Sequence, residues 1–509
     1  MTNDALTSFF SALDASLRRI EQSADKPPSS KGTGIIRSVK DAVIHIDGLP
    51  GLRMGEVLRV VGADASALVM QVERDSAFAL LFGTGNDVRE GMAIRSEDRF
   101  LDIPVGPELL GRVVDPLGNA LDGGTAPNEK GTRMPLEAIA PSVMERSSVN
   151  QPVQTGILAI DALIPVGRGQ RELIIGDRQT GKTTVAIDTI LNQHDQKMVC
   201  IYVAIGQRES KTASVVRTLQ EHGAMKYTVV VNAGASASAV MQFLAPYAGA
   251  AIGEYFMRKG QDALIIYDDL SKHAVAYREM SLLLRKPPGR EAYPGDVFYI
   301  HSRLLERAAK LDEAHGGGSL TALPIIETQA NDVSAYIPTN VISITDGQIF
   351  LESALFNQGV RPAMNVGISV SRVGSSAQTK IMKKASGTVK LDLAQYYELA
   401  AFSQFASELD TTTKRQLVRG ERVVEALKQK PNQPYALWEE ALILRAATGG
   451  YLDGIKRELV QTGIRDLLAN IGANRKGLVE KIEKERALTD EISGEIDAAL
   501  AESFGRVAS

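Results

Sequence analysis

The sequence lacks cysteine pairs, long apolar runs and a strong excess of charge of either sign. Its single cysteine, Cys200, excludes an intramolecular disulfide and lies in an apolar run, which predicts a small core residue. No apolar run reaches the ~18 residues that a transmembrane helix needs. The first ten residues also lack the basic and apolar regions of a signal peptide. If the protein works at a membrane, we expect it to dock there on other proteins.

The charge balance gives no general attraction to nucleic acid. The 57 basic and 61 acidic residues leave a net charge of −4, whereas a nucleic-acid motor more often has a basic excess. The hydrophobic content of 44% and the charged content of 23% are those of an ordinary globular protein. A chain of 509 residues is too long for one hydrophobic core, so we expect two to four domains.

Changes of pattern along the chain predict four regions. Residues 1–33 hold a helix with one apolar stripe from Leu6 to Ile20, followed by a linker; the stripe could pack on its own domain or dock on a partner. In residues 34–98, short apolar runs about ten residues apart predict a small antiparallel β-barrel. Residues 99–380 alternate strands with helices, which is typical of an α/β domain with a mostly parallel sheet. Residues 381–509 are helical almost throughout and predict a helical bundle.

These patterns also give approximate bounds for the elements. The expected barrel strands are 34–39, 42–46, 55–61, 66–72 and 77–82. The expected central strands are 172–175, 198–205, 228–231, 263–267 and 319–326. The expected C-terminal helical stretches are 391–405, 414–428, 435–447 and 455–504.

The strongest motif is a phosphate-binding loop between a predicted strand and a predicted helix. It consists of Gly176, Asp177, Arg178, Gln179, Thr180, Gly181, Lys182 and Thr183. The glycines let backbone N–H groups face an anion, and the helix N-terminus adds its dipole. Lys182 supplies charge for the β- and γ-phosphates, and the Thr183 hydroxyl can bind Mg²⁺. We therefore expect ATP or ADP with Mg²⁺ in this site.

A P-loop domain also needs an acid at the end of a neighbouring strand to hold the water shell of the metal. Asp268 and Asp269 follow the predicted strand 263–267 directly. Such an acid pair is usually a helix cap or a turn, but the P-loop upstream favours the metal role. We assign that role to Asp268, because it comes immediately after the apolar run.

Four long segments resemble the alpha subunits of F-type rotary ATP synthases. They are GRGQRELIIGDRQTGKT (167–183), LIIYDDLSK (264–272), PPGREAYPGD (287–296) and PAMNVGISVSRVG (362–374). The resemblance covers nearly the whole chain. It implies a head of three alpha and three beta subunits around a central gamma subunit, with the N-terminal barrels forming a crown. It also implies that the helix containing Leu6 to Ile20 contacts a peripheral-stalk subunit.

The resemblance implies that this chain is not itself catalytic. Catalytic beta chains of the family have a glutamate at the position of Gln207, where it activates the attacking water. An amide is not a base at neutral pH, and we expect Glu209 to point elsewhere if strand geometry continues. The resemblance also implies that Arg372 reaches the γ-phosphate in a neighbouring beta chain. Ser369, required for activity, and Ser371 would support the turn that aims Arg372.

The adenine pocket of the family matches only in part. Phe356, Arg361, Pro362 and Gln429 agree with it, but Pro431 stands where the family has a second glutamine. Adenine contacts on that side, and strict ATP preference, are therefore in question. With the divergent barrel segment 39–43, this departure indicates an unusual branch, such as a second ATP synthase encoded beside a standard one.

Two other classes share a P-loop core. An export ATPase would need a carboxylate in place of Gln207. A hexameric RNA helicase of the transcription-terminator type would need basic and aromatic residues on its barrel, but residues 34–97 contain only Phe78 and Phe82, in an apolar run that fits a core. We therefore expect no nucleic-acid partner. The expected place is the cytoplasmic face of the bacterial inner membrane, reached through other subunits that transport H⁺ or Na⁺.

Overall fold

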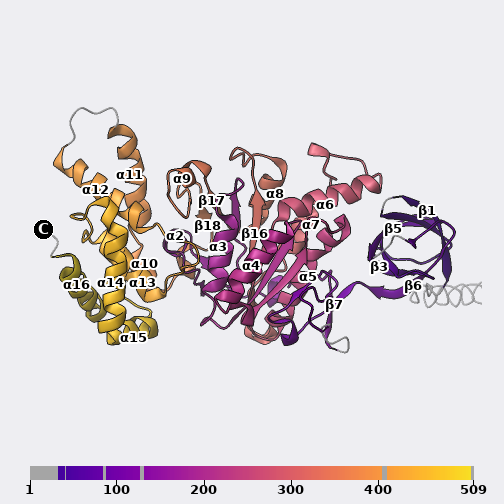
Figure 1. Ribbon diagram of the computed structural model, residues 1–509, viewed down its shortest axis with the longest axis horizontal. Helices are drawn as coiled ribbons and strands as arrows, with labels where there is room; N and C mark the ends of the chain where they lie inside the picture. Colours follow the sequence, from indigo (N-terminus) through magenta and orange to yellow (C-terminus); the bar gives the residue numbers. More distant parts are fainter. Residues whose placement is uncertain (1–31, 41, 84–86, 126–130, 404–409, 506–509) are drawn as a thin grey trace, which may run out of the picture. The chain divides into compact units, whose positions relative to one another are not determined.

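The computed structural model describes residues 32–40, 42–83, 87–125, 131–403 and 410–505. These residues form two compact units (Figure 1). The first contains the described residues up to Asp102 together with the segments 238–240 and 279–287, and the second contains the rest. The expected N-terminal helix with Leu6 and Ile20 lies outside the described residues.

The first unit is built on a closed, antiparallel barrel with the strand order β1-β2-β5-β4-β3-β6, which confirms the predicted barrel. Its strands are β1 (Thr33–Lys40), β2 (Val43–Asp47), β3 (Glu56–Val60), β4 (Ala65–Val72), β5 (Ser76–Gly83) and β6 (Ala93–Phe100). Five were expected; β6 was missed because its sequence, AIRSEDRF, is mostly polar and buries only Ile94. Backbone pairing with β1 and β3 closes the ring through β6.

One of the two aromatic residues of the barrel is less buried than expected. Phe82 is buried, as predicted, with 7% of its surface exposed. Phe78 is only half-buried and stacks on His45 with ring centroids 4.6 Å apart. The prediction that both rings belong to the core was therefore wrong for Phe78. The barrel core consists instead of aliphatic residues such as Ile44, Leu58 and Ile94.

The second unit has a central eight-stranded sheet in the order β18-β17-β12-β16-β15-β13-β14-β8, parallel except for β18. The strands are β8 (Val113–Val114), β12 (Leu173–Gly176), β13 (Met198–Ile205), β14 (Thr228–Ala233), β15 (Asp262–Asp268), β16 (Ser319–Glu327), β17 (Gly347–Leu351) and β18 (Val370–Ser371). All eight residues of β13, Cys200 included, are buried, as expected for the middle of a parallel sheet covered on both faces. Two small sheets pair β7 (Asp102–Pro104) with β9 (Arg133–Pro135) and β10 (Pro152–Val153) with β11 (Val166–Gly167).

Helices connect and flank these strands. They are α2 (Leu158–Leu163), α3 (Lys182–Leu191), α4 (Glu209–Glu221), α5 (Ala239–Arg258), α6 (Leu270–Leu283), α7 (Val297–Leu305), α8 (Tyr336–Ile344) and α9 (Ser353–Asn357). Short 3-10 turns occur at η2 (Pro107–Leu109), η3 (Val143–Glu145), η4 (Ala224–Tyr227), η5 (Arg290–Ala292), η6 (Glu313–His315), η7 (Gly374–Ala377) and η8 (Arg457–Leu459). No helix in the described ranges is long and apolar enough to cross a bilayer.

From Lys380 onward every regular element that the structure describes is helical, as predicted. The helices are α10 (Lys380–Ala385), α11 (Val389–Ser403), α12 (Thr411–Ala426), α13 (Leu437–Thr448), α14 (Val460–Asn474), α15 (Lys476–Glu485) and α16 (Asp490–Phe504). The stretch expected at 455–504 is not continuous. A break at Arg475 separates α14 from α15, and Arg486, with a positive φ of 49°, ends α15. Thr489 then caps α16.

One buried apolar cluster joins the central sheet to the C-terminal helices, from Ile174 on β12 to Leu500 on α16. Polar groups are buried at this junction too. The Gln154 amide donates to the Glu440 carboxyl at 2.5 Å, and Glu440 is fully buried on α13. Burial and the neighbouring carboxyl of Asp161 raise the pKa of Glu440 well above its usual value. Glu440 therefore keeps its proton to a higher pH in the folded chain than in the unfolded chain.

This buried acid predicts how stability varies with pH. The folded state keeps the Glu440 proton while the unfolded state releases it above pH ~4.3, so stability falls as pH rises from there toward the raised pKa. Glu440→Gln removes this dependence. Each pH unit corresponds to about 1.4 kcal/mol, or roughly 2–4 °C in Tm. Calorimetry between pH 5.5 and 8 should show a flatter Tm profile for Glu440→Gln, whereas the exposed Glu480→Gln should follow the wild type. Parallel profiles for all three proteins would contradict the assignment.

Candidate functional site

The site lies at the carboxyl edge of the parallel strands. β12, β13, β15 and β16 run in the same direction, so the loops that follow them meet at one edge of the sheet. The loop after β12 is the glycine-rich segment, the loop after β13 carries Gln207, and β15 ends at Asp268. Three regions that are distant in sequence are thus brought together by strand order.

Backbone geometry explains the two glycines of the loop. A Cβ on Gly176 would lie 2.3 Å from the carbonyl oxygen of Leu351, so no larger residue fits there. Gly181 has a φ of 97°, in the left-handed region that glycine adopts without strain, and it is the N-cap of α3. The loop therefore enters α3 with the first N–H groups of that helix exposed at its end.

Several polar side chains of the loop brace it. Asp177 accepts hydrogen bonds from the Thr328 hydroxyl at 2.7 Å, the Asn331 N–H at 2.9 Å and the Ser353 hydroxyl at 3.1 Å. Burial opposes ionisation of Asp177, but these hydrogen bonds outweigh it and lower its pKa. The Thr180 hydroxyl donates to the carbonyl of Asp177 at 2.9 Å. These contacts fix the conformation of the loop.

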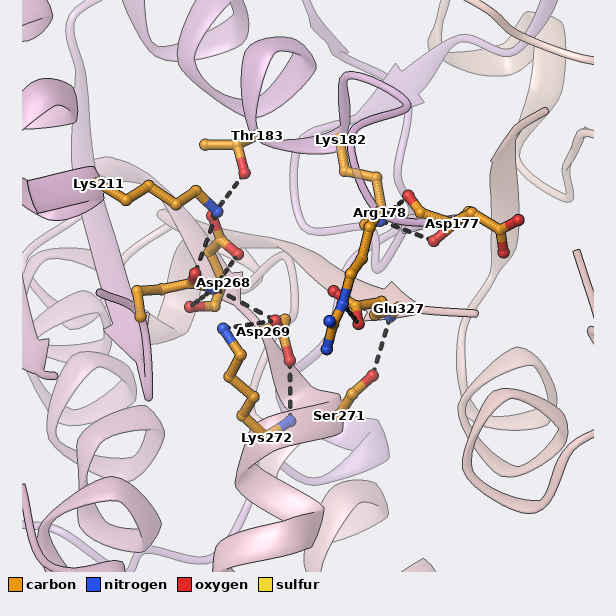
Figure 2. A network of polar contacts seen from close by, with 12 residues as sticks. Asp177, Arg178, Lys182, Thr183, Lys211, Asp268, Asp269, Ser271, Lys272 and Glu327 are labelled. Carbon is orange, nitrogen blue, oxygen red and sulfur yellow. Dashed lines mark hydrogen bonds and ion pairs between the residues drawn. The ribbon is translucent and has the colours of Figure 1, made fainter. Parts of the chain in front are cut away.

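Lys182 lies at the start of α3 with 8% of its surface exposed. Its ammonium donates to the carbonyl oxygen of Gly176 at 2.7 Å and also to that of Asp177. Burial lowers the pKa of Lys182. Arg178 is exposed instead and pairs with Glu327, the last residue of β16, at 2.5 Å. Figure 2 shows the two side chains on the same loop.

Asp268 is the centre of the polar network in Figure 2. Only 1% of its surface is exposed, and its Oδ2 accepts from Thr183 Oγ1 at 2.8 Å, Tyr202 Oη at 2.8 Å and Lys211 Nζ at 3.1 Å. Thr183 and Asp268 offer a hydroxyl and a carboxylate side by side. Hard oxygen ligands of this kind suit Mg²⁺, which takes few protein ligands and completes its shell with water and phosphate. The donor set therefore fits that metal.

Asp269 has a different role from Asp268. Its Oδ1 accepts the N–H of Lys272 at 2.8 Å in the first turn of α6, and the Lys272 ammonium lies 3.5 Å from its Oδ2. Burial raises the pKa of Asp269 to about 6. The helix-cap interpretation thus applies to Asp269, while Asp268 faces the P-loop.

Gln207 is 4% exposed and its amide lies against both acids. Its Nε2 donates to Asp268 Oδ1 at 2.7 Å and lies 3.2 Å from Asp269 Oδ2, while Lys211 donates to its Oε1 at 3.2 Å. Glu209, two residues on, instead accepts from the Asn232 amide at 3.1 Å. Glu209 is thus engaged by Asn232 and does not line the cavity over the P-loop, in agreement with the expectation that it points elsewhere.

Two adjoining cavities lie over the P-loop. The larger, about 920 Å³, is lined by groups including Gln179, Lys182, Thr183, Gln207 and Asp268. Lys211 and Lys272 also line it, so several cations face the space beside the P-loop. The smaller, about 180 Å³, shares Gly181, Thr184 and Phe356 with the first. The larger cavity, with its charged lining, suits the phosphates of a nucleotide, and the smaller, partly apolar cavity suits its base.

The smaller cavity contains the residues expected around the base. The Arg361 guanidinium lies over the Phe356 ring, 4.3 Å from its centroid, and Pro362 and Gln429 also line the space. The Gln429 amide is engaged by the protein: Nε2 donates to the carbonyls of Gly156 at 2.7 Å and Gln433 at 2.8 Å, and Oε1 accepts from the Leu158 N–H at 3.1 Å. Pro431, which has no N–H, forms another part of the wall.

The structure does not bring Arg372 to this site. Arg372 follows β18 at the edge of the sheet, is exposed, and lines neither of the two cavities. The Ser369 hydroxyl donates to the Asn365 carbonyl at 2.6 Å and accepts from the Phe350 N–H at 3.0 Å. The Ser371 hydroxyl donates to the Pro165 carbonyl at 2.8 Å and accepts from the Gly374 N–H at 3.2 Å. Both hydroxyls thus hold the segment that carries Arg372.

Three residues of the site were not found by sequence reasoning. Tyr202 lies inside an apolar strand, where its hydroxyl gave no signal. Lys211 is one helical turn beyond Gln207, and this spacing alone could have pointed to it. Asp188 lines the smaller cavity and accepts from the Asn432 N–H at 2.8 Å, and burial raises the pKa of Asp188 to about 6.

The comparisons with family models and with known proteins agree on one family. The model described as ATP synthase alpha/beta family, nucleotide-binding domain, matches residues 156–371, and the model described as ATP synthase alpha/beta chain, C terminal domain, matches residues 378–503. Two proteins named ATP synthase subunit alpha, from Clostridium botulinum strains Alaska E43 (type E3) and Eklund 17B (type B), are 55% and 54% identical over 478 residues. Each alignment covers 94% of this chain and 94% of the relative.

The position of Lys182 predicts its effect on nucleotide affinity. Lys182→Ala removes a fixed cation from the phosphate end of the cavity, and hydrogen bonds to charged groups contribute roughly 1.5–3 kcal/mol. Titration of the purified chain with a fluorescent ATP analogue should therefore show about 10- to 100-fold weaker binding. Lys226→Ala, which changes an exposed lysine outside the cavity, is the matched control and should bind as the wild type does. Equal affinity in both variants would remove Lys182 from the site.

Proposed function

Because this chain belongs to the ATP synthase alpha/beta family, with alpha subunits among its relatives, we propose that it is a nucleotide-binding, non-catalytic alpha subunit. In this role it forms the soluble head of an ion-translocating ATP synthase together with beta subunits. Its own site holds a regulatory nucleotide, and its Arg372 completes the catalytic site of a neighbouring beta subunit.

The observation that carries the non-catalytic assignment is the environment of Gln207. A water activated for attack on a phosphate needs a base, and a neutral amide has no proton-accepting role at pH 7. The Gln207 amide is already hydrogen-bonded to Asp268. Glu209, the carboxylate two residues after Gln207, is hydrogen-bonded to Asn232 and does not line the cavity over the P-loop. This part of the chain can hold a nucleotide without supplying the base that hydrolysis requires.

ATP or ADP with Mg²⁺ is the proposed ligand. The P-loop N–H groups and Lys182 would hold the phosphates, while Phe356, Arg361, Pro362 and Gln429 would contact the base. Thr183 would bind Mg²⁺ directly and Asp268 would hold its water shell. The metal, when bound, neutralises phosphate charge. Since Pro431 offers no amide and Gln429 is engaged by backbone groups, adenine preference in this pocket would rest on shape and few polar contacts.

The proposed role of Arg372 follows from its exposure and its support. A guanidinium stabilises the charge that builds on a transferred phosphoryl group, a contribution of about 10³ or more in rate. Arg372 is exposed at a sheet edge, while Ser369 and Ser371 hold the backbone on both sides of it. An arginine whose backbone is held while its side chain is exposed is suited to a site on another subunit.

The proposed assembly is a ring of three alpha and three beta subunits around a gamma subunit, with a peripheral-stalk subunit at the N-terminal helix. The domains would be residues 1–33, 34–98, 99–380 and 381–509, as the sequence divides them. The head would lie at the cytoplasmic face of the bacterial inner membrane and attach only through other subunits, which would carry H⁺ or Na⁺. Pro431 and the barrel segment 39–43 favour a second ATP synthase beside a standard one.

The isolated chain should bind Mg-ATP but hydrolyse it far more slowly than about one per second, the low end of enzyme rates. The physical reason is that Gln207 cannot act as a base. Fluorescent-nucleotide titration and a phosphate-release assay measure the two quantities separately. Glu209→Gln is the control, and it should leave the residual rate unchanged. A steady rate of one per second or more, lost in Glu209→Gln, would make Glu209 a catalytic base and reverse the proposal.

Arg372→Ala in the reconstituted alpha/beta complex should lower steady-state hydrolysis at least ~10³-fold, because the lost interaction acts on the transition state. Nucleotide affinity at this chain's own P-loop should stay the same, since Arg372 lines neither cavity there. Arg372→Lys should recover little, because an ammonium lacks the forked donors of a guanidinium. Hydrolysis and ADP affinity are measured on complexes that gel filtration shows to be fully assembled.

A matched control for Arg372 is Arg217, an exposed arginine on α4. Arg217→Ala should retain normal turnover. If Arg372→Ala also retained it in a correctly assembled complex, Arg372 would be an ordinary surface charge.

A further inference from the structure

A fully buried carboxyl lies beneath the hairpin that the antiparallel strands β17 and β18 form, which carries Arg372 at its end. Glu172 directly precedes β12 and has no exposed surface. A Cβ on Gly347 would lie 2.7 Å and 2.9 Å from its two carboxyl oxygens, so the carboxyl packs directly on the Gly347 backbone. Gly347 is in turn the cross-strand partner of Ser371, the residue before Arg372. Glu172 is thus one backbone layer away from the arginine segment.

Gln170 links this carboxyl to the hairpin. Its Nε2 donates to Glu172 Oε2 at 2.7 Å and to Ser371 Oγ at 3.0 Å, while its Oε1 accepts from the Gly167 N–H at 2.7 Å. Both amide donors and the acceptor of this buried side chain are therefore in use. The Ser371 hydroxyl is held on one side by Gln170 and on the other by the Pro165 carbonyl.

Arg171, which lies between Gln170 and Glu172, supports the start of the other strand of the hairpin, β17. Arg171 donates to Asp346 through Nε at 3.0 Å and Nη2 at 2.9 Å. The carbonyl of Asp346 accepts the backbone N–H of Arg372 at 2.8 Å. In an extended segment successive side chains point to opposite sides. Gln170 can therefore reach Ser371 and Glu172 can pack on Gly347, while Arg171 reaches Asp346 on the other side. Both sets of contacts lie beside Arg372.

Glu172 has too few partners to be buried as an ion. Its Oε1 has no hydrogen-bond partner among the described residues. Burial raises the pKa of Glu172 well above its usual value, a nearby Asp346 adds to this effect, and the Gln170 hydrogen bond and the charge of Arg372 oppose it. Asp346 and Arg372 are the charged groups that act on it in the described part of the chain, and Asp346 is already paired with Arg171. Glu172 therefore keeps its proton to a higher pH than an exposed glutamate does, and its carboxyl acts on the nearby Arg372 guanidinium.

We propose that Gln170 and Glu172 are positioning residues for Arg372: Gln170 fixes the hairpin through Ser371, and the Glu172 carboxyl supports the same hairpin by packing on Gly347. This inference rests on the proposed role of Arg372. If Glu172 loses its proton, a buried negative charge attracts Arg372 toward the sheet and away from a neighbouring subunit. Neither residue touches a nucleotide in this account, since neither lines the cavities over the P-loop.

The test uses the reconstituted alpha/beta complex. Gln170→Ala should lower kcat for hydrolysis roughly 10- to 100-fold with KM nearly unchanged, the size of effect that a small misplacement of a catalytic group produces. Wild-type turnover should fall as rising pH ionises Glu172. Glu172→Gln keeps the side-chain shape without a proton to lose, so it should remain active and should not show this fall. Glu440→Gln, a buried acid distant in the chain, is the control and should keep the wild-type pH profile of kcat.

A double-mutant cycle separates this inference from the proposed function. If Gln170 acts through Arg372, Gln170→Ala should have little further effect in an Arg372→Ala background. Full loss in Arg372→Ala, together with normal kcat in Gln170→Ala and an unchanged pH profile in Glu172→Gln, would overturn the positioning role alone. Normal activity in Arg372→Ala would overturn the proposed function itself. Should Gln170→Ala fail to assemble, the pH profile of Glu172→Gln decides the matter.

Discussion

The nucleotide site depends on one buried negative charge, the Asp268 carboxylate. A carboxylate with 1% exposure is stable only if other groups compensate it. Here a hydroxyl from α3, a phenol from β13 and an ammonium from α4 all converge on its Oδ2. Each of these elements is thereby fixed relative to β15. The P-loop helix is linked to β15 through Oδ2 of this carboxylate, and the Gln207 loop is linked to it through Oδ1.

Two pairs of buried acids in the described part of the chain differ in the partners that surround them. Asp268 and Glu254 are buried beside cations, Glu254 through a two-pronged contact with Arg307 at 2.8 Å. Glu172 and Glu440 are buried with an amide as partner, and burial raises the pKa of both. They lie beneath the arginine hairpin and at the junction with the C-terminal helices, so the loss of either proton would place a charge between packed segments.

The sequence predicted most strongly where one local pattern determines the structure. The apolar run of β13, the glycine-rich loop and the position of Asp268 could all be found in this way, and the three-part architecture is confirmed. The predictions failed where an element or side chain is stabilised by residues that are distant in the sequence. β6 is a polar strand that exists because β1 and β3 pair with it, and Phe78 stacks on a histidine of the neighbouring strand. The contacts of Tyr202, and those between Gln170 and Ser371, also depend on strand order, which no local pattern specifies.

The short strand β12 separates two sites that serve different subunits in the proposed assembly. Glu172 stands at its start and Gly176 at its end, and β12 pairs with β16 on one side and β17 on the other. At about 3.3 Å per residue, the strand acts as a spacer of roughly 13 Å. Adding or removing one residue would turn Glu172 to the opposite face or carry the P-loop out of line with Asp268. Geometry therefore fixes the number of residues between the two sites, in addition to the burial that each side chain of β12 requires.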